Sequence, residues 1–265
     1  MNQRIDLQKK LRLKILELSY RAKSGHIGSS LSCIDLLIAI LFYQKKENDT
    51  FILSKGHAAL ALYCCLNEAG EIPDEILDTF YLNGTRLPAH PAPNQVKGIP
   101  FATGSLGHGF PLAAGIAKAN KISRDDSFVY TLLSDGDTNE GTTWETAHFA
   151  VQHHLNNLVV IIDKNKIQGF DKSSAVLGDT AAAAKWADIG FEVLEIEDGH
   201  DLEEINKSLS ILKASENPMP KLLIANTVKG KGVSYMENTV DWHYWPMNDE
   251  QYQQAVREIN SNGHA

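Results

Sequence analysis

Two apolar runs separated by one helical stretch constrain the fold of this chain more than any other feature of its sequence. The runs cover residues 128–133 (FVYTLL) and 158–162 (LVVII), and each has the length and composition of a buried strand. Residues 142–154 between them have the pattern of a helix. A strand–helix–strand unit of this kind places its two strands parallel and close together in one sheet.

Helical and strand patterns alternate along the rest of the chain. Beyond the central unit, helices are expected over residues 4–23, 32–44, 57–69, 109–120, 181–188, 202–213 and 250–259, and strands over residues 51–53, 191–196 and 221–226. Residues 83–104 are rich in Pro and Gly and are expected to form a long loop, a feature that is often functional. The alternation predicts an α/β fold, a doubly wound and mostly parallel sheet with helices on both faces. No linker or repeat interrupts it, so we expect a single domain over residues 1–265.

Composition excludes several classes of protein. The net charge of −8 argues against a general binder of nucleic acid, which normally carries an excess of basic residues. The three cysteines, Cys33, Cys64 and Cys65, form no CxxC pair and predict no disulfide framework. The apolar run at 36–43 is too short to span a membrane, and the first residues lack an apolar signal core. We therefore expect a cytoplasmic protein without nucleic-acid or membrane partners.

Polar side chains close both strands of the central unit. Asp135 and Gly136 follow the first strand, and Asn165 follows the second, thirty residues later. In open α/β sheets ligands bind beyond the carboxyl ends of the strands. Carboxylate and amide oxygens there suit a hard cation such as Mg²⁺ or Ca²⁺ that carries a diphosphate. Taken alone, the same residues also fit an ordinary turn at Asp135-Gly136 and a loop position at Asn165.

The segment from Ser134 to Gly141, followed by Asp163-Lys164-Asn165-Lys166-Ile167, resembles the thiamine-diphosphate signature, in which an Asn follows a Gly-Asp-Gly by about thirty residues. More specifically, the chain resembles the N-terminal half of a transketolase. Further segments occur in that family's order and extend over nearly the whole chain: Ser24-Gly25-His26-Ile27-Gly28, Ser54-Lys55-Gly56-His57, Ala89-His90-Pro91, residues 103–109, and residues 227–232 ahead of His243.

This resemblance implies a thiamine diphosphate cofactor held with Mg²⁺ or Ca²⁺. The metal ligands would be the side-chain oxygens of Asp135 and Asn165 and the backbone carbonyl of Ile167. The cofactor-binding residues implied are His57, Gly104, Leu106, Asp135, Gly136, Asn165 and His243. Gly136 would offer its N–H to the diphosphate, as the start of the following helix favours anions. Lys229 and Lys231 either reach the phosphates or form a solvated charge pair.

The resemblance also assigns roles to histidines. His57 and His243 match those that donate to the diphosphate, whereas His26 and His90 match those that line the substrate channel and assist proton movement. His26, His90 and His243 are thus the candidate catalytic residues, since the ordinary histidine pKa lies near working pH. Taken singly, any of these histidines also fits a structural role. Glu140 fits either a helix-start carboxylate or a protomer-interface residue.

Several positions depart from the family pattern. Ser134 stands where Gly is usual, Ile27 where Pro is common, and Ala89 where Gly precedes the histidine. Ser105 and His108 replace Pro and Gln, and Tyr244-Trp245-Pro246 replaces small residues after His243. No metal or diphosphate ligand is lost. The changes near His108 and Tyr244 bear instead on the substrate channel and leave the sugar specificity open.

The resemblance covers only the first half of a complete transketolase. It implies the N-terminal subunit of a two-chain enzyme that transfers a two-carbon ketol unit between sugar phosphates. A C-terminal transketolase-like subunit would supply the pyrimidine-binding domain, in an α₂β₂ assembly. The alternatives are a 1-deoxyxylulose-5-phosphate synthase-like or other acyloin-forming enzyme, and a non-catalytic relative. A nucleotide-binding Rossmann domain is disfavoured, because residues 104–107 lie in a loop and form no Gly-x-Gly-x-x-Gly after a strand.

Overall fold

The computed structural model describes residues 2–261, with side chains from residue 6 onward. Five strands form one sheet in the order β1-β2-β3-β5-β4, and every neighbouring pair is parallel. The strands are β1 (Thr50–Leu53), β2 (Val129–Ser134), β3 (Leu158–Lys164), β4 (Glu192–Ile196) and β5 (Lys221–Asn226). The predicted parallel sheet and the predicted strand–helix–strand unit are confirmed.

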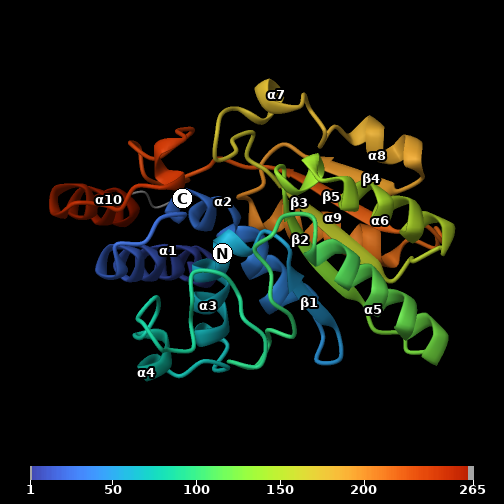
Figure 1. Cartoon of the computed structure of the whole chain (residues 1–265), viewed down its shortest axis with the longest axis horizontal. Helices are drawn as coiled ribbons and strands as arrows, with labels where there is room; N and C mark the ends of the chain where they lie inside the picture. Colours follow the sequence, from blue (N-terminus) through green and yellow to red (C-terminus); the bar gives the residue numbers. More distant parts are fainter. Residues whose placement is uncertain (1, 262–265) are drawn as a thin grey trace.

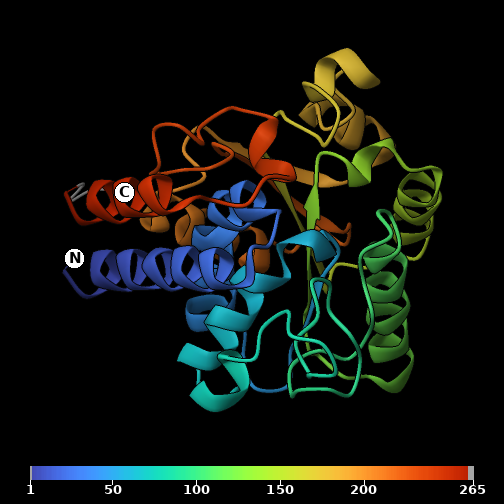
Figure 2. The same ribbon diagram turned by 60° about the vertical axis from the view of Figure 1, so that its left-hand side comes forward.

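Helices cover both faces of this sheet (Figure 1). One face carries α1 (Asn2–Ala22), α2 (Ile27–Ile38), α3 (Ala59–Glu68), α9 (Leu202–Ala214) and, against α1, α10 (Asp249–Ser261). The other face carries α5 (Gly109–Ser123), α6 (Gly141–Gln152) and α8 (Ala183–Ile189). In the view of Figure 2, α1 and α10 lie side by side on one side of the molecule and α5 lies on the other. The doubly wound α/β class is therefore confirmed.

The central strand β3 shows why its sequence is apolar without alternation. Val159 and Ile161 pack into the core beneath α1, α2 and α9, whereas Val160 and Ile162 pack into the core beneath α5 and α6. Because both faces of a parallel strand are covered, both sets of side chains must be apolar. The polar residues that follow such a strand therefore mark where it leaves the core.

Helix α2 begins at Ile27, five residues before the expected start, and its last part, Ala39–Gln44, is a π-helix. The combined stretch Ile27–Gln44 is long and apolar enough to cross a membrane, although the continuous apolar run within it is short. In this fold, however, 78% of that window is buried inside the protein, as expected for a core helix.

Several short elements lie between the main helices and strands. The helices α4 (Asp74–Leu77) and α7 (Ser173–Val176) and the 3₁₀ turns η2 (Gly56–Ala58), η3 (Asp137–Asn139) and η4 (Asp241–His243) were not expected from the sequence. Residues 83–104 form the expected long loop. Gly136 precedes η3 rather than α6, so a 3₁₀ turn separates the predicted anion-binding glycine from the helix.

Candidate active site

The ends of β2 and β3 lie side by side at the carboxyl edge of the sheet. Ser134 is paired with Asp163 in the strand register, so Asp135 and Asn165 emerge next to each other. Asp135 Oδ2 accepts hydrogen bonds from the Lys166 backbone N–H at 2.7 Å and from Ser173 Oγ at 2.9 Å. Within residues 2–261 no hydrogen bond uses Oδ1 of Asp135. One oxygen of this carboxylate is thus fixed by the protein and the other is available to a ligand.

The side chain of Asn165 is held in one orientation. Its Nδ2 donates to Ser32 Oγ at 3.0 Å and to Asp163 Oδ2 at 3.3 Å. Its Oδ1 accepts from the Ile167 N–H at 3.1 Å, which turns the chain so that Ile167 reaches the same cavity. An amide oxygen can accept a second interaction. The structure therefore gathers Asp135, Asn165 and Ile167, the residues predicted as metal ligands, at one cavity.

Beneath Asn165 lies a buried ion pair that the sequence analysis did not assign. Lys55 and Asp163 are both fully buried and bonded to each other, and Asp163 also accepts from Ser32 Oγ at 2.7 Å and from Thr227 Oγ1. Burial opposes ionisation of Asp163, but the adjacent Lys55 ammonium outweighs it and holds the pKa of the carboxyl below its usual value. This network fixes the orientation of Asn165.

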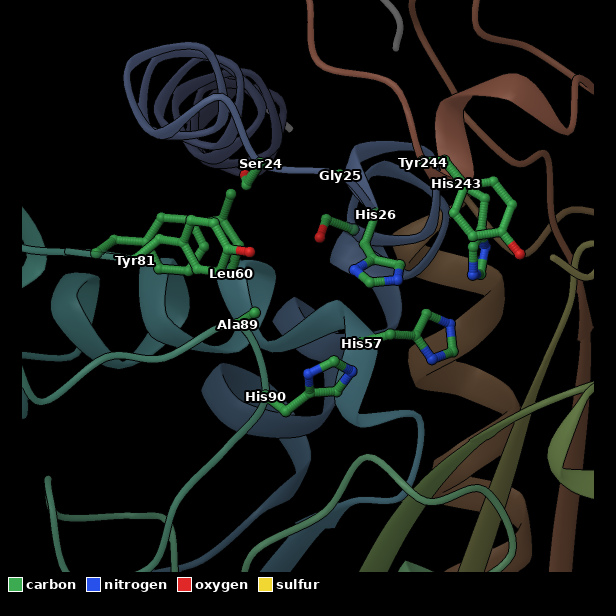
Figure 3. A pocket seen from close by; sticks show the side chains of 12 residues that line it. Ser24, Gly25, His26, His57, Leu60, Tyr81, Ala89, His90, His243 and Tyr244 are labelled. Carbon is green, nitrogen blue, oxygen red and sulfur yellow. The ribbon is translucent and has the colours of Figure 1, made fainter. Parts of the chain in front are cut away.

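Four histidines converge from four separate segments (Figure 3). The ring centroid of His26 lies 5.7 Å from that of His57, 5.6 Å from that of His90 and 4.8 Å from that of His243. His57 and His243 are 5.6 Å apart. His26 stands directly before α2, His57 lies in η2, His90 in the long loop and His243 in η4. The fold thus brings together all four histidines singled out in the sequence.

These histidines are uncharged at neutral pH. Burial lowers the pKa of His26 to about 4, and burial together with Lys229 lowers that of His243 to about 3. Burial also lowers the pKa of His90 and, with Lys55, places that of His57 well below the ordinary value. Neutral imidazole rings both donate and accept hydrogen bonds, so they suit the binding of hydroxyl groups and the transfer of protons.

The position of His26 depends on a contact between distant parts of the chain. Its backbone is left-handed, with φ 65°, and its N–H donates to the His243 carbonyl at 3.0 Å. A left-handed conformation is unfavourable for residues other than glycine and persists where the surroundings enforce it. The main chain therefore locks two of the candidate catalytic residues together.

A side chain at position 104 or 136 would crowd a neighbouring residue of the site, and at position 104 the backbone conformation also favours glycine. Gly104 has φ 148°, and a Cβ there would lie 2.9 Å from Cδ2 of His90. A Cβ on Gly136 would lie 3.0 Å from Cδ1 of Leu106. The backbone of both segments consequently approaches the cavity closely.

Two adjoining cavities share the four histidines and Tyr244. The inner one, about 210 Å³, is lined by all ten residues predicted for the site: His26, His57, His90, Gly104, Leu106, Asp135, Gly136, Asn165, Ile167 and His243. The outer one, about 370 Å³, extends past the histidines toward Leu60, Phe80 and Tyr81. The structure places these ten residues around one cavity. The role of each residue stays a prediction.

Lys229 and Lys231 differ in their surroundings. Lys229 is buried, and its Nζ lies 3.2 Å from Nδ1 of His243 and 3.3 Å from the Gln168 carbonyl. Burial, with Lys55 nearby, lowers its pKa to about 8. Lys231 is only partly buried. Of the two, only Lys229 therefore contacts residues that line the cavity.

The oxygen donors predicted for a metal are of mixed type. Among residues 2–261 no group of three or more His, Cys, Asp or Glu side chains is arranged to hold a metal ion. A single carboxylate, one amide and a main-chain carbonyl are donors for a hard cation that takes its remaining ligands from phosphate and water. The donor set fits the metal–diphosphate group predicted from the sequence.

Comparison with known proteins identifies the class to which this site belongs. Residues 4–264 match the family model described as "Transketolase, thiamine diphosphate binding domain". The fold matches a crystal structure of transketolase from Campylobacter jejuni with a TM-score of 0.90 and 31% identity, over 99% of this chain but only 44% of that one. The chain thus spans less than half the length of that transketolase.

Two similar proteins have nearly the same length as this chain. An apulose-4-phosphate transketolase subunit of Phocaeicola vulgatus is 38% identical over 97% of this chain and 94% of its own length. A 6-deoxy-6-sulfo-D-fructose transketolase subunit of a Clostridium species is 35% identical, with 98% of both chains covered. The chain belongs to the transketolase N-terminal family. It has the length of these separate subunits and is a transketolase-like transferase subunit.

Proposed function

We propose that this chain binds the diphosphate end of thiamine diphosphate together with Mg²⁺ or Ca²⁺. Asp135, Asn165 and the Ile167 carbonyl would hold the cation. The observation that carries the proposal is the convergence of all ten predicted site residues on one cavity at the carboxyl edge of the sheet. The available Oδ1 of Asp135 and the fixed amide of Asn165 support the metal assignment.

The remaining residues would divide between the diphosphate and the organic part of the cofactor. His57, His243 and the Gly136 N–H would lie on the diphosphate side, with Lys229 behind His243, and Gly104 and Leu106 would lie beside the middle of the cofactor. When bound, thiamine diphosphate supplies the carbon nucleophile that accepts a two-carbon unit from a ketose. His26, His90 and His243 would bind the substrate hydroxyls, and their neutral rings would accept and return protons.

We further propose that activity requires a second chain. The partner would be a C-terminal transketolase-like subunit with the pyrimidine-binding domain, in an α₂β₂ assembly that transfers a ketol unit between sugar phosphates. The names of the similar subunit-length proteins support a divided enzyme. The free, buried cysteines Cys33, Cys64 and Cys65 support a reducing, cytoplasmic location.

The test is two-carbon transfer measured with the purified chain, alone and mixed with the co-expressed candidate partner. We expect turnover only in the mixture, and only with thiamine diphosphate and a divalent cation present. Robust turnover by the single chain would contradict the divided enzyme. A panel of ketose phosphates, including apulose 4-phosphate, and 6-deoxy-6-sulfofructose would identify the donor.

A further inference from the structure

A second buried polar cluster lies outside the candidate active site. Asp35 of α2 and Arg12 of α1 are fully buried and form a two-pronged ion pair, with N–O distances of 2.9 and 2.5 Å. Gln8 donates to Asp35 at 2.8 Å, and Nδ1 of His200 lies 2.7 Å from Asp35 Oδ2. None of these residues lines either cavity described above. No role follows for them from the proposed binding of the cofactor alone.

The hydrogen bonds determine which nitrogen of His200 carries the proton. Its Nε2 lies 2.9 Å from the backbone nitrogen of Val228, whose N–H can only donate. Nε2 must therefore be the unprotonated acceptor, and Nδ1 must carry the proton and donate to Asp35. Burial opposes ionisation of Asp35, but Arg12 and then His200 outweigh it and hold the pKa of the carboxyl well below its usual range. The ionised carboxylate thus selects the tautomer that can accept from Val228.

Val228 connects this cluster to the cavity. It lies between Thr227, which donates to Asp163, and Lys229, whose Nζ approaches His243 and Gln168. The next residue, Gly230, donates from its N–H to the Gly28 carbonyl at 2.9 Å. Every residue from 227 to 230 therefore contacts a different part of the protein through a polar group. At Val228 this contact is the hydrogen bond to His200.

The segment that carries His200 is itself fixed against the end of β5. The Gly199 N–H donates to the Asn226 carbonyl at 2.7 Å, and a Cβ on Gly199 would lie 2.5 Å from Cγ2 of Thr227. His200 N–H donates to Asp198 Oδ1 at 2.9 Å. The backbone after β4 consequently packs directly on the backbone after β5, and the imidazole spans from there to α2.

We propose that His200 is a positioning residue that sets the place of Lys229 behind His243 and Gln168, two residues that line the cofactor cavity. Arg12 and Asp35 hold the His200 tautomer, Nε2 of His200 holds the Val228 N–H, and this bond places the Lys229 ammonium beside His243. The inference rests on the proposed binding of a diphosphate in the cavity, because the position of Lys229 affects function only if a diphosphate binds there. A buried ion pair often contributes little net stability, so its retention suits a role in fixing geometry.

Two substitutions separate the contacts of His200. H200Q retains an acceptor near the position of Nε2 and loses the donor to Asp35, whereas H200N retains a donor near Nδ1 and loses the acceptor for Val228. The rate of hydrogen exchange of the Val228 amide, measured in the full chain without cofactor, reports directly on its hydrogen bond to His200. We expect exchange to be faster by about tenfold in H200N and within about threefold of wild type in H200Q, as the loss of one hydrogen bond predicts.

The same variants are then compared for thiamine diphosphate affinity by calorimetry, with Mg²⁺ and in the complex with the partner subunit. H200N is expected to weaken binding by about tenfold, and H200Q by less than about threefold. In a K229M background, H200N is expected to change the affinity by less than about twofold, because two residues that act through one contact are not additive.

Equal effects of H200N and H200Q, or an undiminished effect of H200N in the K229M background, would overturn the positioning role. Equal loss of thermal stability in both variants with unchanged affinity would assign His200 to stability only and would likewise overturn it. Failure of the wild-type complex to bind thiamine diphosphate would instead remove the proposed function on which the inference rests. The two failures are therefore distinguished by the wild-type titration.

Discussion

The carboxylate of Asp135 accepts a 2.7 Å hydrogen bond from the backbone N–H of Lys166, across the gap between the ends of two neighbouring strands. Lys166 has a left-handed backbone, with φ 67°, so the chain turns directly after β3 and presents its N–H to the end of β2. One carboxylate oxygen is used by this bond, which leaves the other available to a ligand. The orientation of the Asp135 carboxylate is thus set by a main-chain turn and the Ser173 hydroxyl, whereas the Lys55–Asp163 pair fixes Asn165.

Asp135→Asn is expected to stabilise the cofactor-free chain at neutral pH. Burial, with the nearby Asp163, raises the pKa of Asp135 to about 6 from an ordinary value of 3.8. The folded chain then holds this proton more tightly than the unfolded chain, so the cost of Asp135 grows as pH rises from 4 to 6 and is complete above about 6. The amide avoids that cost, which is up to about 3 kcal/mol.

Urea unfolding of the wild type and of D135N, measured from about pH 4.5 to pH 8 with a chelator present, checks this expectation. The difference in unfolding free energy should be largest above about pH 6.5 and should shrink toward pH 4.5. A constant difference across the range would show that Asp135 does not titrate in this interval.

Asp135→Ala is expected to weaken metal-dependent binding of thiamine diphosphate by more than about tenfold, because it removes the one carboxylate among the protein ligands proposed for the cation. Asp179→Asn is the matched control, since Asp179 is exposed and pairs with Lys164 at 3.1 Å outside the inner cavity. Calorimetric titration of each complex, with the partner subunit present, gives the two affinities. Unchanged affinity in D135A would refute the assignment of this ligand.

Lys55→Met is expected to destabilise the fold by about 3–5 kcal/mol, because it leaves the buried Asp163 carboxylate without its cation. Lys97→Met removes an exposed ion pair with Glu71 and should cost less than about 1 kcal/mol. Chemical denaturation of both variants measures the contrast. The double variant K55M/D163N should recover part of the loss, and a double variant less stable than K55M would argue against a coupled pair.

Gly104→Ala is expected to destabilise the loop and displace His90. Its φ of 148° is strained for alanine, and the new Cβ would lie 2.9 Å from the imidazole, so we expect a loss of more than about 1 kcal/mol. Gly115→Ala is the control, because Gly115 lies within α5 with open space around it and should gain about 0.5–1 kcal/mol. Thermal unfolding compares the two, and a neutral G104A would show that the loop adapts.

The strands were predictable because their signals are local. The run at 158–162 lies in β3 and that at 128–133 lies in β2 apart from Phe128, and the polar residues after them lie at the carboxyl edge as expected. The start of α2 was placed at residue 32 instead of Ile27. The residue before it, His26, takes its left-handed conformation with support from the His243 carbonyl, and no local pattern contains a contact of that range.

Only the site residues that belong to recognisable sequence motifs were predictable. Asp135, Gly136 and Asn165 were indicated by the ends of two strands, and the other seven cavity residues came from resemblance, which records residue type and order. Lys55 and Asp163 stood inside quoted motifs, yet their pairing across 108 residues has no periodic signal. His200 belongs to no motif and acquires its partners only when the ends of β4 and β5 pack together. The single-turn helices α4 and α7 are too short to show periodicity.

The main-chain bond between His26 and His243 has a consequence for biosynthesis. A chain growing on the ribosome exposes its first segments long before residue 243 leaves the exit tunnel. Until then the pocket lacks one of its walls, so a vitamin-derived coenzyme would find no completed site on the nascent chain. Any stabilisation by the bound coenzyme would therefore act on the finished polypeptide.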